Sequence, residues 1–139
     1  MPKAIFVNLP VADVARSTAF YEAIGFRKND GFSNAQASAM VWSDAISVML
    51  LDHGFYSTFT SKRIIDAKTT SGVLLCLSFD DREDVDAIHR ASTAAGGTET
   101  RAIDDAGFMY GGAFEDPDGH VWETLWMNPA ATPPAGDPR

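Results

Sequence analysis

The sequence predicts an α+β fold in which two tandem βαβββ modules form a curved mixed sheet around a cleft. The same order of patterns occurs twice, about 68 residues apart, which indicates a duplicated unit. Alternating apolar runs at residues 4–9 and 73–79 indicate strands, and a helical apolar pattern that ends at glycine follows each of them. The rest of each copy consists of short alternating runs between turn formers, as expected for three further strands.

The first module spans residues 4–52. Its opening strand is stopped by Pro10, and Asp13 is expected to cap a helix that ends at Gly25. Further strands are expected near residues 26–29, 37–42 and 46–51. Turn-forming pairs such as Asp30-Gly31 separate these strands.

The second module spans residues 73–127. Asp81 is expected to cap its helix, and acidic residues in the first turn suit the helix dipole. The inner face of this helix is expected to contain Val85, Ile88, Ser92 and Ala95. Three strands are expected at residues 98–102, 109–115 and 120–127, and the DPDG turn joins the last two. In this register Phe6 corresponds to Leu74, and Asn8 to Cys76.

Two stretches lie outside the repeat. The connection at residues 53–72 is expected to be a loop with a short helix around 62–67. A connection of this length is often a lid or binding loop, and an inert linker is the alternative. The segment 128–139 is rich in Pro, Ala and Gly and is expected to be disordered.

Composition indicates one globular domain over residues 1–127 of a 139-residue chain that is 45% hydrophobic. No apolar run approaches the roughly 20 residues of a membrane span, and a signal-peptide pattern is absent from the start. A net charge of −8 disfavours nucleic acid as a partner. One cysteine fits a reducing compartment, so we expect a cytoplasmic protein.

Two motifs, FYEAIGF at residues 20–26 and FEDPDGHVWE at 114–123, carry a family resemblance. Together with the repeat, they resemble the vicinal oxygen chelate superfamily, which includes glyoxalase I, extradiol dioxygenases and bleomycin-resistance proteins. The resemblance covers residues 5–127. It implies the fold more strongly than an activity, because members isomerise, oxygenate, open epoxides or only sequester their ligands.

The resemblance also implies four positions at which metal-dependent members carry His, Gln or Glu. Here these positions are Phe6, Met49 (within one residue), Leu74 and Glu123, so only Glu123 is a usual ligand. We therefore expect no bound metal and no other cofactor. A divalent metal held by unusual ligands is the less favoured alternative.

The candidate site combines these positions with polar neighbours. Asn8 is expected to face the cleft beside Phe6, and Cys76 beside Leu74, because alternate strand residues share a face. Tyr110 is a further candidate donor. The expected ligand-binding residues are Phe6, Asn8, Met49, Leu74, Cys76, Tyr110 and Glu123. Glu123 is the candidate catalytic residue, although a former ligand position now paired with an Arg explains it equally well.

Three functions remain open. The first is a binding protein that holds a small organic molecule in an apolar cleft. The second is a glyoxalase-like lyase or a dioxygenase with unusual metal ligands. The third is a metal-free enzyme in which Glu123 acts as a base beside Asn8 or Tyr110. The apolar residues at three of the four ligand positions favour the first, and in each case we expect a homodimer.

Overall fold

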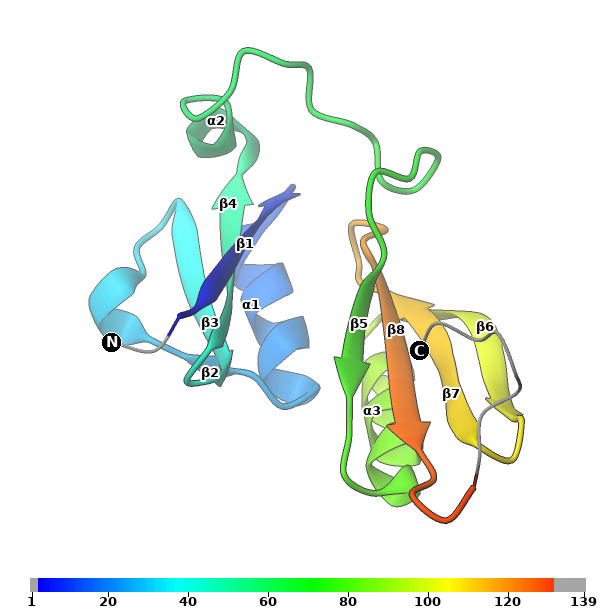
Figure 1. Cartoon of the computed structure of the whole chain (residues 1–139). Coiled ribbons are helices and arrows are strands. Elements are labelled where there is room, and N and C mark those ends of the chain that lie inside the picture. Colours follow the sequence, from blue (N-terminus) through cyan, green and yellow to red (C-terminus); the bar gives the residue numbers. More distant parts are fainter. Residues whose placement is uncertain (1–2, 132–139) are drawn as a thin grey trace.

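The computed structural model describes residues 3–131 and contains two four-stranded mixed sheets with helices packed against them (Figure 1). The strand order is β1-β4-β3-β2 in the first sheet and β5-β8-β7-β6 in the second. The predicted α+β fold of two tandem modules is confirmed. Within one chain, however, the strands form two separate sheets, one for each module.

In the first module, β1 (Ile5–Val11) runs parallel to β4 (Ile46–Asp52), and β3 (Ala37–Ser43) is antiparallel to β4. The two-residue strand β2 (Arg27–Lys28) forms the far edge, and a 3-10 turn, η1 (Asp30–Phe32), follows it. The helix α1 (Val14–Ala23) begins after Asp13, whose side chain accepts a hydrogen bond from Arg16 N at 3.1 Å. The predicted cap is confirmed.

The second module repeats this arrangement. Its strands are β5 (Leu75–Ser78), β6 (Thr98–Asp105), β7 (Met109–Glu115) and β8 (Val121–Met127), and its helix is α3 (Arg82–Ala94). As in the first module, the first strand pairs in parallel with the last. Asp81 occupies the N-cap position of α3, but its side chain makes no capping hydrogen bond.

Both modules contribute to one hydrophobic core. Phe20 of α1 lies 6.4 Å from Phe114 of the second sheet, and Tyr21 lies 6.0 Å from Trp122, measured between ring centroids. Leu9 and Leu77, from the first strand of each module, belong to the same cluster. In Figure 1, α1 lies between the two sheets. Because strand side chains alternate, the other face of each sheet points away from this core.

The DPDG turn and the first helix form a buried polar junction between the modules. The Tyr21 hydroxyl donates to Asp116 Oδ2 at 2.6 Å and accepts from Trp122 Nε1 at 2.9 Å. The other oxygen of Asp116 accepts from the amides of Asp118 and His120. Burial raises the pKa of the Asp116 carboxyl, and burial together with this carboxylate raises the pKa of Tyr21 well above its ordinary value. The two sequence motifs therefore contact each other directly.

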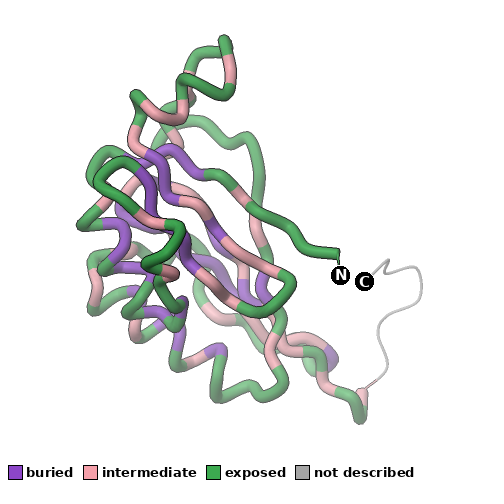
Figure 2. The backbone as a smooth tube through the Cα atoms, turned by 90° about the vertical axis from the view of Figure 1, so that its left-hand side faces the viewer, coloured by how far each residue is buried: buried purple, intermediate pink, exposed green. Residues whose placement is uncertain are grey.

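The connection differs from its prediction. The expected helix around 62–67 is wrong: this stretch is irregular, and a four-residue helix, α2 (His53–Tyr56), forms instead directly after β4. Asp52 caps α2 by accepting from Phe55 N at 2.8 Å. Figure 2 shows that most of the connection is exposed.

The chain after β8 is described only as far as residue 131. Asn128 N donates to Phe108 O at 2.8 Å, and the rest of the segment predicted to be disordered lies outside the described residues. Within residues 3–131, no helix has the length and apolar character needed to cross a membrane.

Candidate functional site

The open face of the first sheet carries an apolar hollow of about 630 Å³. Phe6 of β1 and Met49 of β4 line it, and Phe32 of η1 borders it. Phe6 is 65% exposed and Phe32 is 74% exposed, which is high for side chains of this size. The remaining lining residues are Asn29, Ala39, Val41, Ser43, Asp44 and Ser47. Small side chains on β3 leave room between the two aromatic rings and the sheet.

Asn8 lies next to this hollow. It is exposed and pairs in register with Met49, and alternation places it on the same face of β1 as Phe6. Val7, Leu9 and Val11 occupy the opposite face and pack on the core. The structure therefore brings Phe6, Asn8 and Met49 to one face of the first sheet.

The open face of the second sheet carries the equivalent residues of the second copy. Cys76 pairs in register with Glu123, just as Asn8 pairs with Met49 in the first sheet. The Glu123 carboxylate lies 3.2 Å from the Arg101 guanidinium. Leu74 immediately precedes β5 and is 55% exposed. This face therefore combines a charged pair with an exposed apolar side chain.

These two groups of predicted site residues do not meet within one chain. The core lies between the two sheets, so the face with Phe6 and Met49 points away from the face with Cys76 and Glu123. The hollow in the first sheet consequently contains no residue from the second module. Each open face therefore carries about half of the predicted site residues.

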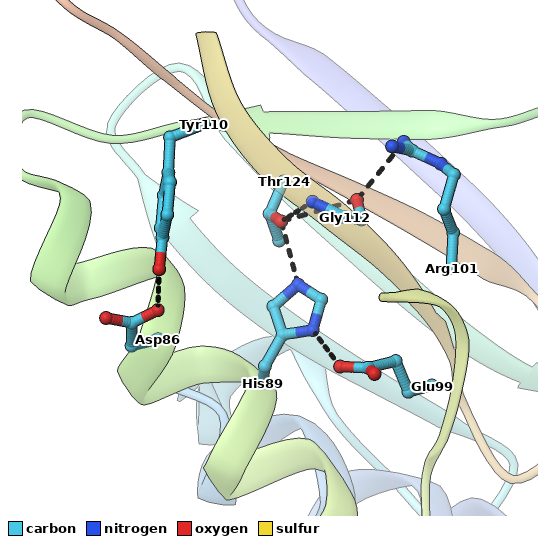
Figure 3. Close-up of polar contacts among 7 residues, drawn as sticks. All are labelled: Asp86, His89, Glu99, Arg101, Tyr110, Gly112 and Thr124. Atoms are coloured by element: carbon cyan, nitrogen blue, oxygen red, sulfur yellow. Dashed lines mark hydrogen bonds and ion pairs between the residues drawn. The ribbon is translucent and has the colours of Figure 1, made fainter. Parts of the chain in front are cut away.

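Tyr110 lies apart from both groups, on the helix-covered face of the second sheet (Figure 3). Its hydroxyl donates to Asp86 Oδ1 of α3 at 2.5 Å, and the Arg82 guanidinium lies 4.3 Å from its ring centroid. The hydrogen bond to Asp86 raises the pKa of Tyr110 above its ordinary value. The structure thus shows Tyr110 as a contact between β7 and α3.

A buried polar chain around His89, also drawn in Figure 3, was missed by the sequence analysis. The ring nitrogens of His89 lie 3.0 Å from Glu99 Oε2 and 2.8 Å from Thr124 Oγ1, and Gly112 N donates to Thr124. A signal was present, because position 89 continues the spacing of Val85, Ile88 and Ser92 along the inner face of α3.

The chemistry of the side chains does not fit the metal site of the metal-dependent relatives. Phe6 and Leu74 offer no donor atom, Met49 offers only a thioether, and Glu123 is already paired with Arg101. Among residues 3–131, no three His, Cys, Asp or Glu side chains are grouped so that they could hold a metal ion.

The duplicated module, the shared core and the hollow on an open sheet face define a class of small two-module α+β proteins. The sequence pattern of the Glyoxalase/Bleomycin resistance protein/Dioxygenase superfamily matches residues 4–124. The chain belongs to this superfamily. Among curated proteins, none matches it significantly.

Solved structures agree with this assignment at the level of the fold. A hypothetical protein from S. aureus is 24% identical with a TM-score of 0.77, covering 91% of this chain and 94% of its own. A glyoxalase/bleomycin resistance protein/dioxygenase family enzyme from Burkholderia phytofirmans is 20% identical with a TM-score of 0.73, and the match covers 91% of this chain and 100% of that enzyme. A bleomycin resistance determinant encoded on the transposon Tn5 is 23% identical with a TM-score of 0.63, covering 91% and 99%.

Proposed function

We propose that the chain binds a small organic molecule against the apolar hollow of the first sheet without a catalytic metal. The hollow, at about 630 Å³, lies within the size range of small-molecule sites. The observation that carries the proposal is the pair of exposed aromatic rings, Phe6 and Phe32, at its border. Exposed rings of this kind supply affinity by burying apolar area and by stacking on a ligand.

The complete cleft is proposed to form in a homodimer. A ligand held between the two halves of the constellation requires two chains, because the halves of one chain point away from each other. The first sheet of one copy would face the second sheet of its partner, and two-fold symmetry would create two identical clefts. Phe6 and Leu74, exposed large apolar residues of the two open faces, would then be covered.

Glu123 is proposed to orient the ligand. Its carboxylate has Arg101 as a partner at 3.2 Å, and this pair presents an acceptor and a donor on the same face. The alternative role, a metal-free base, is less favoured because the Glu123 carboxylate is already engaged by the Arg101 guanidinium. The pair supports recognition of a polar group on an otherwise apolar molecule.

The ligand site is tested by a thermal-shift screen with small aromatic and amphipathic compounds, since a ligand that prefers the folded state raises the midpoint. Phe6→Ala should abolish the shift of each hit. Phe59→Ala is the matched control, because Phe59 is 67% exposed but lies on the connection, outside the hollow. Equal losses in the two variants, or none in either, would show that the protein binds its ligands elsewhere.

The assembly is tested by light scattering on the same protein. We expect twice the 15.0 kDa mass of one chain at tens of micromolar. Leu74→Asp would place a charge on the covered face and should shift the mass toward that of one chain. A monomer that still binds hits through Phe6 would mean that one open face is sufficient.

A further inference from the structure

A second hollow, of about 420 Å³, lies where the two modules meet the connection. We call it the junction hollow. Its walls come from residues 10–16 of the first module, residues 64–68 of the connection and residues 117–120 of the DPDG turn, and His53 of α2 borders it. It shares no residue with the hollow on the first sheet. The function proposed above therefore makes no use of it.

Besides His120, whose Nε2 lies 2.7 Å from Pro10 O, the junction hollow is lined by three side chains that carry or can carry positive charge: Arg16, His53 and Lys68, from three different segments. Within residues 3–131, none of these three side chains has a hydrogen bond or an ion pair. This is notable in a protein with 19 acidic against 11 basic residues, where carboxylates are abundant as partners. Cations gathered around one concave surface repel each other unless an anion joins them.

The acidic side chains of the junction hollow already have backbone partners. Asp118 Oδ1 accepts from Ala12 N at 2.9 Å, and Asp66 Oδ1 accepts from Lys68 N at 3.0 Å. Neither carboxylate lies within ion-pair distance of Arg16, His53 or Lys68. The acids thus shape the walls, and the cationic side chains remain available to a ligand.

The walls of the junction hollow are held in place by close contacts. Gly119 has a φ of +96°, and a Cβ built there would lie 2.6 Å from Lys68 N, so only glycine lets the connection pack on the turn. On the other side, His120 Nε2 lies 2.7 Å from Pro10 O. A hollow whose walls are already fixed loses little conformational freedom when it binds a ligand.

We propose that the junction hollow is a binding site for a small anion with a carboxylate or phosphate group. Arg16 would grip two oxygens with its planar guanidinium, and Lys68 would supply a point charge. His53 would add a further donor. The volume suits a molecule larger than a single inorganic ion, so the anionic group would be one end of a small metabolite.

Isothermal titration at constant ionic strength tests this proposal, with inorganic phosphate and citrate as the two probes. We expect saturable binding of at least one probe, with one site per chain. The double variant Arg16→Gln/Lys68→Gln should weaken that binding at least about tenfold, because charge-assisted hydrogen bonds are lost. Both side chains are exposed, so the variant should keep its fold.

The matched control is Lys62→Gln/Arg63→Gln, which likewise replaces one Arg and one Lys but at positions outside the hollow. It should change the affinity by less than about twofold. Binding of phosphate alone would identify a phosphate ligand, and binding of citrate alone a carboxylate ligand. Failure of both probes to saturate, or equal weakening in the two double variants, would overturn the proposal.

Discussion

Removing one hydroxyl group at the junction between the modules should destabilise the whole protein. Tyr21→Phe keeps the ring but deletes the oxygen that donates to Asp116 at 2.6 Å and accepts from Trp122 at 2.9 Å. A hydrogen bond to a carboxylate contributes about 1.5–3 kcal/mol, and leaving the buried Trp122 N–H without an acceptor costs about 1–3 kcal/mol. We therefore expect the free energy of unfolding to fall by about 2.5–6 kcal/mol.

Urea unfolding at neutral pH measures this change, with an unchanged denaturant slope as the sign that only stability is affected. Tyr56→Phe is the control, because the Tyr56 hydroxyl has no partner within residues 3–131. That variant should stay within about 0.5 kcal/mol of the native chain.

A double-mutant cycle with Trp122→Phe should show a coupling above about 0.5 kcal/mol, because both changes remove the same hydrogen bond. A loss below about 1 kcal/mol for Tyr21→Phe would refute the reasoning, since it would mean that water or a rearranged neighbour replaces the hydroxyl.

Alkaline pH, an added methyl group and metal analysis provide three further tests. The pKa of Tyr21 in the folded protein is raised above its ordinary value of 10.0, so the unfolded chain loses this proton at lower pH than the folded protein. The free energy of unfolding should therefore fall as the pH rises above about 10, and Tyr21→Phe should reduce this pH dependence. Gly119→Ala should lower the Tm more than Gly107→Ala. Both glycines have a positive φ, but only a Cβ at position 119 would clash with the backbone of the connection, at Lys68 N. Elemental analysis of dialysed protein should find no stoichiometric divalent ion, and one equivalent lost on Glu123→Ala would contradict the metal-free proposal.

The repeat made the geometry of each sheet predictable. An offset of about 68 residues equates Asn8 with Cys76, and the structure pairs them in register with Met49 and Glu123, the last-strand positions taken from the family resemblance. Local features were predictable as well, because strand alternation and an N-cap such as Asp13 depend only on nearby residues.

Contacts distant in sequence were not predictable in the same way. The sequence analysis expected the DPDG turn only to join two strands, yet Asp116 is a buried partner of Tyr21, 95 positions away. Sequence spacing cannot show which faces of two modules meet, so it also left open whether Glu123 and Phe6 share one cleft. The structure places their faces on opposite sides of a common core.

The helix expected around 62–67 does not form, although the sequence places a short helix in the connection. Thr60 Oγ1 accepts from Lys62 N at 3.2 Å at the start of this stretch, yet residues 62–67 stay irregular, whereas Asp52 immediately precedes α2 and accepts from Phe55 N. His89 was not among the residues expected on the inner face of α3, although its spacing belongs to that face. Buried polar residues obey the same periodicity as apolar ones when partners such as Thr124 and Glu99 are present.

The common core also determines how the chain unfolds. Neither module keeps a complete set of apolar neighbours when the other is removed, because Phe20 and Tyr21 of the first pack on Phe114 and Trp122 of the second. Unfolding should therefore be all-or-none. In native-state hydrogen exchange, the central amides of β4 and β8 should share one opening free energy. A ligand that binds only the first sheet would then slow exchange in the second sheet to the same extent, without any change of shape.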